Sequence, residues 1–214
     1  PGGAGGLPPR RTRRCAMKQR PYAPVGVFFR GSGDPAYERA VNACRAKCRR
    51  YSRIRPAAVR RQRRFLRRLF GRTGKDVTVV APFCCDYGYN IEVGDRFYAN
   101  RNVTMQDGAK ITFGDDVFIA PDCVFTTAEH AVDPQLRKAG YEVAKPIAVG
   151  NNVWIGAGAI ILAGVTIGDN AVIGAGSVVT RSVPANVVAA GVPCRVLRQV
   201  CEEDARRYPM AERE

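Results

Sequence analysis

The chain has 214 residues, with one histidine, eight cysteines and a formal net charge of +15 at pH 7. It holds no run of eighteen apolar residues and no charged–apolar–small leader pattern, so neither a membrane span nor a secretory signal is predicted. Residues 1–76 carry 22 Lys and Arg against 3 Asp and Glu, whereas the remainder carries 12 against 16. The length suits one core with an appendage. Because the cysteines suggest no disulfide framework, we expect a protein of the reducing cytoplasm.

The eight cysteines form no recognisable disulfide framework, and Cys84 and Cys85 are adjacent. Cys44 and Cys48 stand four residues apart, which on a helix is most often a small apolar packing pair. With a single histidine and no CxxC pair, no metal site is predicted.

The N-terminal fifth of the chain divides by composition. Residues 1–20 are rich in Gly, Pro and Arg without periodicity, which predicts disorder. Met17 as the natural start of the chain, with added sequence before it, is a further possibility that the residues leave open.

Residues 21–76 are predicted to form a basic helical segment. Asp34-Pro35 has the pattern of a helix start, and helices are expected over Tyr37–Tyr51 and Ala57–Phe70, with a stop at Gly71. Arginines surround an apolar stripe in the second helix, made of Val59, Phe65, Leu66, Leu69 and Phe70.

A stretch from Val149 to Pro184 repeats every six residues, as VGNNVW, IGAGAI, ILAGVT, IGDNAV, IGAGSV and VTRSVP. The first position is always Val or Ile, the fifth is mostly small or β-branched, and Gly, Asn or Asp mark turns. This period fits neither an α-helix nor a simple strand, but it predicts a parallel β-helix in which three hexads form one triangular coil. Stacked coils then bury the first-position side chains in one core.

We expect this solenoid over residues 77–200, beginning with a strand at Thr78–Phe83. The repeat slips between Met105 and Phe113, and it fails over residues 126–146, which are polar and include His130. A long insertion in a regular scaffold is usually functional, because the scaffold does not need it. After Pro184 a basic, strand-like cap follows, and residues 201–214 form a polar tail.

Several segments together resemble the galactoside/maltose O-acetyltransferase family of hexapeptide-repeat sugar O-acetyltransferases. They are PFCCDYGYNIEVGDRFYANRNV, TTAEHAVDPQLR, KPIAVGNNVWIGAGAIILAGVTIG, GAGSVVT and VVAAGVPCRVLR. The resemblance implies a mainly β fold, a left-handed parallel β-helix with a small N-terminal helical segment. It also implies a homotrimer with active sites between subunits, and acetyl transfer from acetyl-CoA to a sugar hydroxyl without a metal.

His130 matches the catalytic histidine of that family. By itself, a single histidine in a polar loop is more often a solvated side chain. The resemblance favours a general base, because a neutral imidazole can take the proton of a sugar hydroxyl as it attacks the thioester.

The resemblance also implies a set of donor-binding residues. Ala157 would lie beside the thioester and offer its backbone N–H to the oxyanion, with Asn100 near the acetyl group. Trp154 would line the same cleft, although core or interface packing explains a tryptophan almost as well. The remaining coenzyme A contacts are Ala175, Thr180, Arg181, Arg195 and Arg198, of which the last two would otherwise be a solvated edge.

Asp34 and Asp86 are the candidates for holding the sugar, since carboxylates accept hydrogen bonds from hydroxyls. Asp107 joins them, because it adjoins Gly108, where the family has an acidic residue near the sugar. Asp34 has an N-cap as its alternative role.

Two alternatives accompany the predicted sugar O-acetyltransferase. One is an acetyltransferase for another hydroxylated acceptor, such as a lipo-oligosaccharide or an antibiotic. The other is a protein that binds an anionic polymer through the basic helix, since Lys and Arg give sequence-independent affinity. The apolar stripe favours a docked helix instead, so neither nucleic acid nor membrane is an expected partner.

Overall fold

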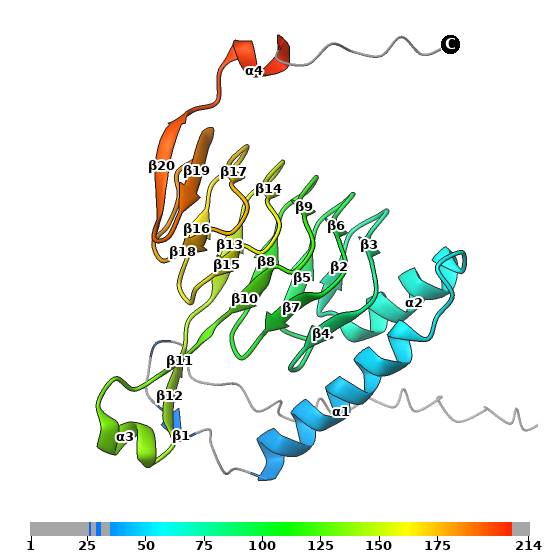
Figure 1. The fold of residues 1–214 in the computed structure, drawn as a ribbon. Coiled ribbons are helices and arrows are strands. Elements are labelled where there is room, and N and C mark those ends of the chain that lie inside the picture. Colours follow the sequence, from blue (N-terminus) through cyan, green and yellow to red (C-terminus); the bar gives the residue numbers. More distant parts are fainter. Residues whose placement is uncertain (1–25, 27–28, 31–34, 207–214) are drawn as a thin grey trace, which may run out of the picture.

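The computed structural model describes residue 26, residues 29–30 and residues 35–206 of the chain. Within them, short strands wind into three parallel sheets that form the three sides of a β-helix (Figure 1). The predicted segment 1–20 and the candidate Asp34 lie outside the described residues. No helix in the described ranges is both long and apolar enough to cross a bilayer.

Sheet 1 has the strand order β18-β15-β10-β7-β4. Its strands, in chain order, are β4 (Phe83–Cys85), β7 (Val103–Gln106), β10 (Val124–Thr126), β15 (Ile160–Ile161) and β18 (Val178–Val179). Sheet 2 has the order β16-β13-β8-β5-β2. Its strands are β2 (Arg72–Thr73), β5 (Ile91–Val93), β8 (Ile111–Phe113), β13 (Ile147–Val149) and β16 (Thr166–Ile167).

Sheet 3 has the order β20-β19-β17-β14-β9-β6-β3. Its strands are β3 (Thr78–Val79), β6 (Tyr98–Ala99), β9 (Phe118–Ile119), β14 (Trp154–Ile155), β17 (Val172–Ile173), β19 (Val187–Gly191) and β20 (Cys194–Gln199). The strand predicted over Thr78–Phe83 is therefore wrong in extent. It is two strands in different sheets, because the chain turns a corner at residues 80–82.

The core follows the hexads. Every first-position side chain from Val149 to Val179 is at most 4 % exposed, and the fifth positions from Val153 to Val183 are at most 7 % exposed. In the earlier coils larger side chains fill the same space, since Phe97, Phe113 and Phe125 stack with ring centroids 5.0 and 5.2 Å apart. The prediction of a continuous β-helix core is confirmed.

The corner between sheets 2 and 3 is regular from coil to coil, and we call it the ladder corner (residues 94–97, 114–117, 150–153 and 168–171). Its side-chain oxygens join successive coils: Asp115 Oδ1 accepts from the Asp95 N–H at 2.7 Å, and Asn151 Oδ1 accepts from the Asp115 N–H at 2.9 Å. A Cβ at Gly94 would collide with the Asp115 carboxylate and the Gly114 backbone, so this close stacking requires glycine.

Helices close the first end of the solenoid. Helices α1 (Pro35–Ser52) and α2 (Val59–Leu69) lie beside β4, β2 and β3 (Figure 1). The Tyr51 hydroxyl donates to the Val79 carbonyl at 2.6 Å, and Leu66 and Leu69 are buried. Val59 differs from the predicted apolar stripe, since its position in the first turn of α2 leaves it 45 % exposed. The arginines of α2 are mostly exposed.

The antiparallel hairpin β19–β20 lies at the other end of the solenoid, as the predicted strand-like cap requires (Figure 1). A short helix, α4 (Glu202–Arg206), follows it.

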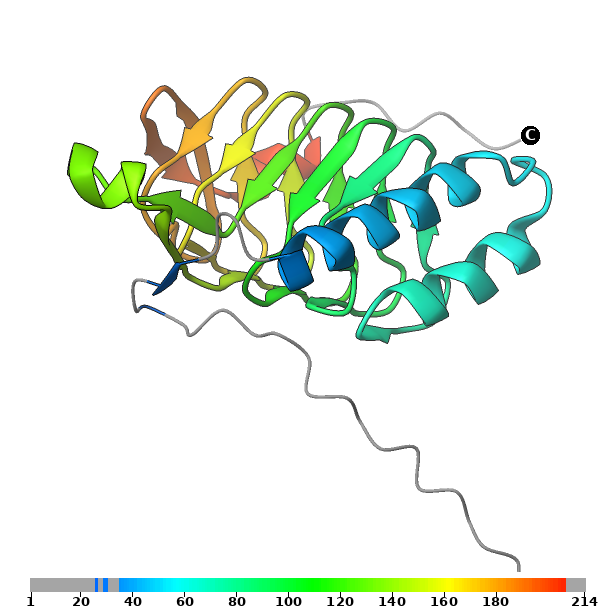
Figure 2. The same cartoon turned by 90° about the horizontal axis from the view of Figure 1, so that it is seen from below.

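One insertion leaves the side of the solenoid (Figure 2). It contains β11 (Ala128–His130), α3 (Pro134–Lys138) and β12 (Tyr141–Ala144). The strands β11 and β12 pair antiparallel, and β1 (Phe29–Arg30) adds a third strand on the outer edge of β12.

Candidate active site

His130 is the last residue of β11, at the tip of the inserted hairpin, where it pairs with Glu142 of β12. Its side chain is exposed. The hairpin leaves the solenoid between β10 of sheet 1 and β13 of sheet 2, so the histidine projects from a corner of the triangle instead of from a flat side.

The turn after His130 is held in place by its own residues. Asp133 caps α3, with its Oδ1 accepting from the N–H groups of Gln135 and Leu136 at 3.0 and 2.8 Å. Arg137 donates back to the carbonyls of Ala131 and Val132 at 3.0 and 2.8 Å. These contacts fix the chain direction immediately after His130. The Asp133-Pro134 pair is the sequence signal that could have predicted them.

The carboxylate next to the histidine is already engaged. Glu129 accepts a hydrogen bond from Lys145 at 2.7 Å, across the base of the hairpin. The carboxylate of Glu129 is therefore held by Lys145, and Glu142 lies opposite His130 on the paired strand.

Other predicted residues lie at the same corner, which we call the histidine corner (residues 86–90, 107–110, 127–146, 162–165 and 180–182). Asp86 follows β4 directly, is partly buried, and lies 4.0 Å from Arg45 of α1. Burial raises the pKa of the Asp86 carboxyl, and the Arg45 guanidinium opposes that rise. Thr180 and Arg181 follow β18 at this corner and are exposed.

Asp107 supports Asp86 from beneath. It is 0 % exposed, and its Oδ1 accepts from the N–H groups of Asp86 and Tyr87 at 3.0 and 2.9 Å. Burial raises the pKa of Asp107 to about 6. The carboxyl predicted to contact the sugar thus orders the turn that carries Asp86. The sequence alone could not distinguish the role of Asp107 from that of Asp86.

The predicted thioester residues lie at a different corner, between sheets 3 and 1, which we call the alanine corner (residues 100–102, 120–123, 156–159 and 174–177). Ala157 and Ala175 occupy equivalent exposed turns, and the Gly176 N–H donates to the Ala157 carbonyl at 2.8 Å. Asn100 stands two coils before Ala157, and its Oδ1 accepts from the Arg101 N–H. The hydrogen bonds of the described residues leave the Ala157 N–H without an acceptor.

An aromatic column runs down the outer face of sheet 3. Trp154 is 57 % exposed and Phe118, its partner on the next strand, is 51 % exposed. Tyr98 continues the column, with its ring centroid 6.2 Å from that of Phe118. Trp154 therefore lies on the surface, and the core-packing alternative for it is wrong.

Arg195 and Arg198 lie on β20, at the edge of sheet 3. Arg195 donates to the Cys194 carbonyl at 2.8 Å, whereas Arg198 forms a two-pronged pair with Asp204 of α4 at 2.7 Å for each bond. The Asp204 carboxylate raises the pKa of Arg198. The partnership between β20 and α4 was not predicted.

One chain therefore presents two sets of candidate residues. Asp86, His130, Thr180 and Arg181 share the histidine corner, whereas Asn100, Ala157 and Ala175 share the alanine corner. Sheet 1 separates the two corners in every coil. Among the described residues, the two sets of one chain therefore lie at opposite edges of sheet 1.

The fold and the hexapeptide repeat together define the class of protein. Residues 146–181 match the family model described as bacterial transferase hexapeptide (six repeats). A putative acetyltransferase of Saccharomyces cerevisiae, YJL218W, is 44 % identical over 180 residues, which cover 84 % of this chain and 92 % of that protein.

Two solved structures define the protein family more narrowly. A galactoside acetyltransferase in complex with coenzyme A superposes with a TM-score of 0.80 at 40 % identity, over 84 % of this chain and 90 % of that one. A maltose O-acetyltransferase from Clostridium difficile 630 superposes with a TM-score of 0.76 at 44 % identity, over 79 % and 90 %. The chain belongs to the galactoside/maltose O-acetyltransferase family, and it is an acyltransferase.

Proposed function

We propose that this protein transfers the acetyl group of acetyl-CoA to a hydroxyl of a sugar, at three equivalent sites between the subunits of a homotrimer. His130 is the general base. The observation that carries the proposal is the placement of this histidine at one corner of the solenoid and of the thioester residues at another.

The reaction needs the sugar hydroxyl to lose its proton as its oxygen attacks the thioester carbon. His130 is exposed at the tip of an ordered hairpin, and the neighbouring Glu129 is paired with Lys145, so the imidazole takes the proton. The Ala157 N–H, which has no acceptor in the described part of the chain, donates to the oxyanion of the tetrahedral intermediate. The thiolate of coenzyme A then leaves with a proton from the imidazolium.

The substrates bind on opposite sides of that centre. Asp86 accepts hydrogen bonds from acceptor hydroxyls, with Asp107 holding its backbone. Asn100, Trp154 and Ala175 line the donor side, and the arginines at 181, 195 and 198, with Thr180, contact the phosphates of coenzyme A. The proposal is supported by a relative whose structure contains coenzyme A.

Trimer formation also explains the aromatic column. Trp154 and Phe118 expose more than half of their surface, and a partner subunit would remove them from water. In a closed threefold ring the histidine corner of one subunit meets the alanine corner of the next.

Mixed trimers test this arrangement. His130→Ala inactivates the histidine corner, and Ala157→Trp blocks the alanine corner. If each site is built from two subunits, co-refolding the two inactive variants in equal amounts should restore about a quarter of the wild-type sites. Activity is followed as thiol release from acetyl-CoA with a panel of sugars, and mass spectrometry of the products gives the acceptor. Mixtures that stay inactive although native mass spectrometry shows mixed trimers would contradict a shared site.

A further inference from the structure

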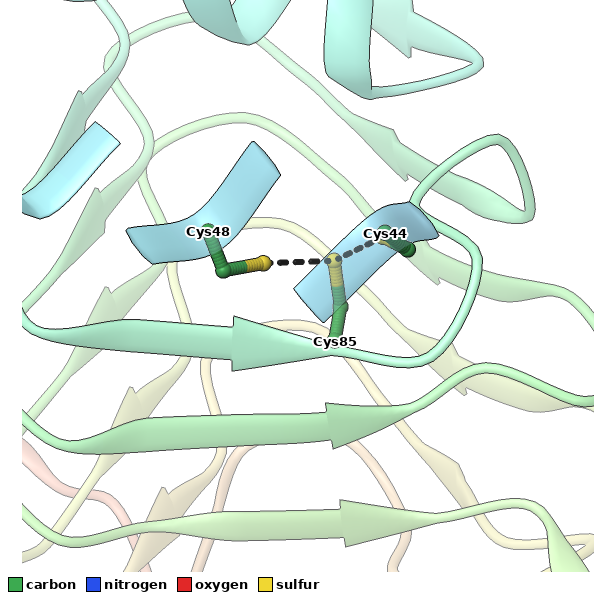
Figure 3. A group of neighbouring side chains, drawn as sticks. All are labelled: Cys44, Cys48 and Cys85. Carbon is green, nitrogen blue, oxygen red and sulfur yellow. Dashed lines mark hydrogen bonds between the residues drawn. The ribbon is translucent and has the colours of Figure 1, made fainter. Parts of the chain in front are cut away.

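Three cysteines converge beneath the N-terminal helices, next to the turn that carries Asp86. Cys44 and Cys48 come from adjacent turns of α1, and Cys85 is the last residue of β4. Their sulfur atoms point toward one another in Figure 3. The Cys85 Sγ lies 3.6 Å from that of Cys44 and 3.7 Å from that of Cys48, and all three sulfurs lie within 4.8 Å of one another.

The cluster is enclosed. The three side chains are 2, 4 and 1 % exposed, in chain order. Ordinary packing of apolar side chains would place carbon atoms here as readily as sulfur. Three thiols from two separate elements instead make a set of converging sulfur donors.

We propose that Cys44, Cys48 and Cys85 form a binding site for a single soft cation, Cu(I), which joins α1 to β4. Among the described residues the donor set is sulfur only, and thiolates select soft metals over Mg²⁺ or Ca²⁺. With metal–sulfur bonds of about 2.3 Å, three sulfurs around one ion stand about 4.0 Å apart, which is within reach of the observed spacing.

The number of ligands favours Cu(I) over Zn(II). A structural zinc site takes four ligands, whereas the described residues supply three sulfurs, on side chains that are each at most 4 % exposed. The Cys84 thiol interacts with that of Cys48, but Cys84 is partly exposed and lies outside the group of three sulfurs that are all within 4.8 Å of one another. An ion that accepts three ligands is the better match.

Binding needs no redox step. Each ligating thiol gives up its proton to solvent, and the copper remains Cu(I) throughout.

The test uses the full chain under anaerobic, reducing conditions, after iodoacetamide has blocked the accessible thiols. Cu(I) is titrated against bicinchoninate, a coloured Cu(I) chelator, and the copper environment is measured by X-ray absorption. We expect one tightly bound Cu(I) per chain with three sulfur neighbours, and a rise in the melting temperature on binding.

Variants assign the ligands. Cys44→Ala and Cys85→Ala should each weaken Cu(I) binding by roughly a hundredfold or more, whereas Cys194→Ala, at a buried cysteine of the distant β20, should leave it unchanged. Circular dichroism of each metal-free variant shows whether it folds, and the sulfur count in the wild-type protein does not depend on any variant. Two or fewer sulfur neighbours, equal binding by Cys44→Ala, or four-coordinate Zn(II) that displaces Cu(I) would each overturn the proposal.

Discussion

The ladder corner and the histidine corner belong to the same coils, yet they differ in the regularity of their turns and in the role of their side chains. At the ladder corner Asp95, Asp115, Asn151 and Asp169 repeat one role, in which a side-chain oxygen accepts a backbone N–H of the preceding coil. At the histidine corner the turns vary in length, and one of them expands into residues 127–146.

The difference shows which residues the fold itself requires. A solenoid gains stability from each repeated contact between neighbouring coils, so the regular corner is accounted for by stacking alone. The inserted hairpin makes no such contribution, yet Asp133, Arg137 and Lys145 all hold its shape. We therefore assign chemistry to the irregular corner and stability to the regular one. Substitutions at the two corners should separate these properties.

The largest effect is expected at the irregular corner. His130→Ala should lower kcat by about 10² to 10⁴ and leave affinity for acetyl-CoA nearly unchanged, because the variant loses the base without losing the donor contacts. Steady-state kinetics with acetyl-CoA and a sugar acceptor measure both quantities.

Glu129→Gln is the matched control for that experiment, since it changes the adjacent residue and removes only the pairing with Lys145. Near-normal turnover by a folded His130→Ala variant would show that His130 is a surface residue of the hairpin.

The next effect concerns the donor side. Arg195→Ala should raise KM for acetyl-CoA by about ten- to a hundredfold, with a smaller change in KM for the acceptor, because a charge-assisted contact to phosphate is lost. Arg198→Ala should have a smaller effect, since Asp204 already engages that guanidinium through two bonds. Equal changes in both KM values would indicate instead that the β19–β20 hairpin is distorted.

Asp107 is expected to affect stability although it lies at the histidine corner, because its side chain is buried. A carboxyl whose pKa rises on folding stabilises the folded chain while it is protonated. This contribution is present below pH 4 and is lost as the pH rises through about 6. Asp107→Asn stays neutral and keeps an oxygen that can accept from Asp86 and Tyr87. Between pH 4 and pH 7 its free energy of unfolding should therefore gain about 1–3 kcal/mol relative to wild type.

Urea unfolding of both proteins at the two pH values measures this difference. A difference that does not change with pH would show that Asp107 titrates alike in the folded and unfolded chains.

The sequence predicts these regions unequally. The β-helix core follows from the hexads, because Val149 to Val183 carry their periodicity in the residues themselves. The helices close to Tyr37–Tyr51 and Ala57–Phe70 follow from their start and stop signals. Their position over the end of the solenoid does not, since it depends on packing between segments far apart in the chain.

Long-range packing also explains which side-chain contacts the sequence did not predict. Cys44 and Cys48 are a visible pair, but Cys85 joins them only because α1 lies against β4. Asp86 and Asp107 are the same residue type in the sequence, and only their different burial in the folded chain distinguishes their roles. The candidate His130 came from resemblance, and a periodicity argument could identify only the insertion that carries it.

The smallest effect is expected at the regular corner. Asp115→Ala should lower the free energy of unfolding by about 0.5–1.5 kcal/mol and leave kcat and both KM values unchanged, because it removes one acceptor from the Asp95 N–H. Asp115→Asn is the matched control. Asn151 already fills the equivalent position in the next coil, where its Oδ1 accepts from the Asp115 N–H. The amide variant should therefore retain the stability that alanine loses. Urea unfolding and steady-state kinetics on the same preparations measure the two properties together. If Asp115→Ala lowered kcat as well, chemistry and stability would not be divided between the two corners, and the regular corner would have to transmit strain to the hairpin through the shared coils.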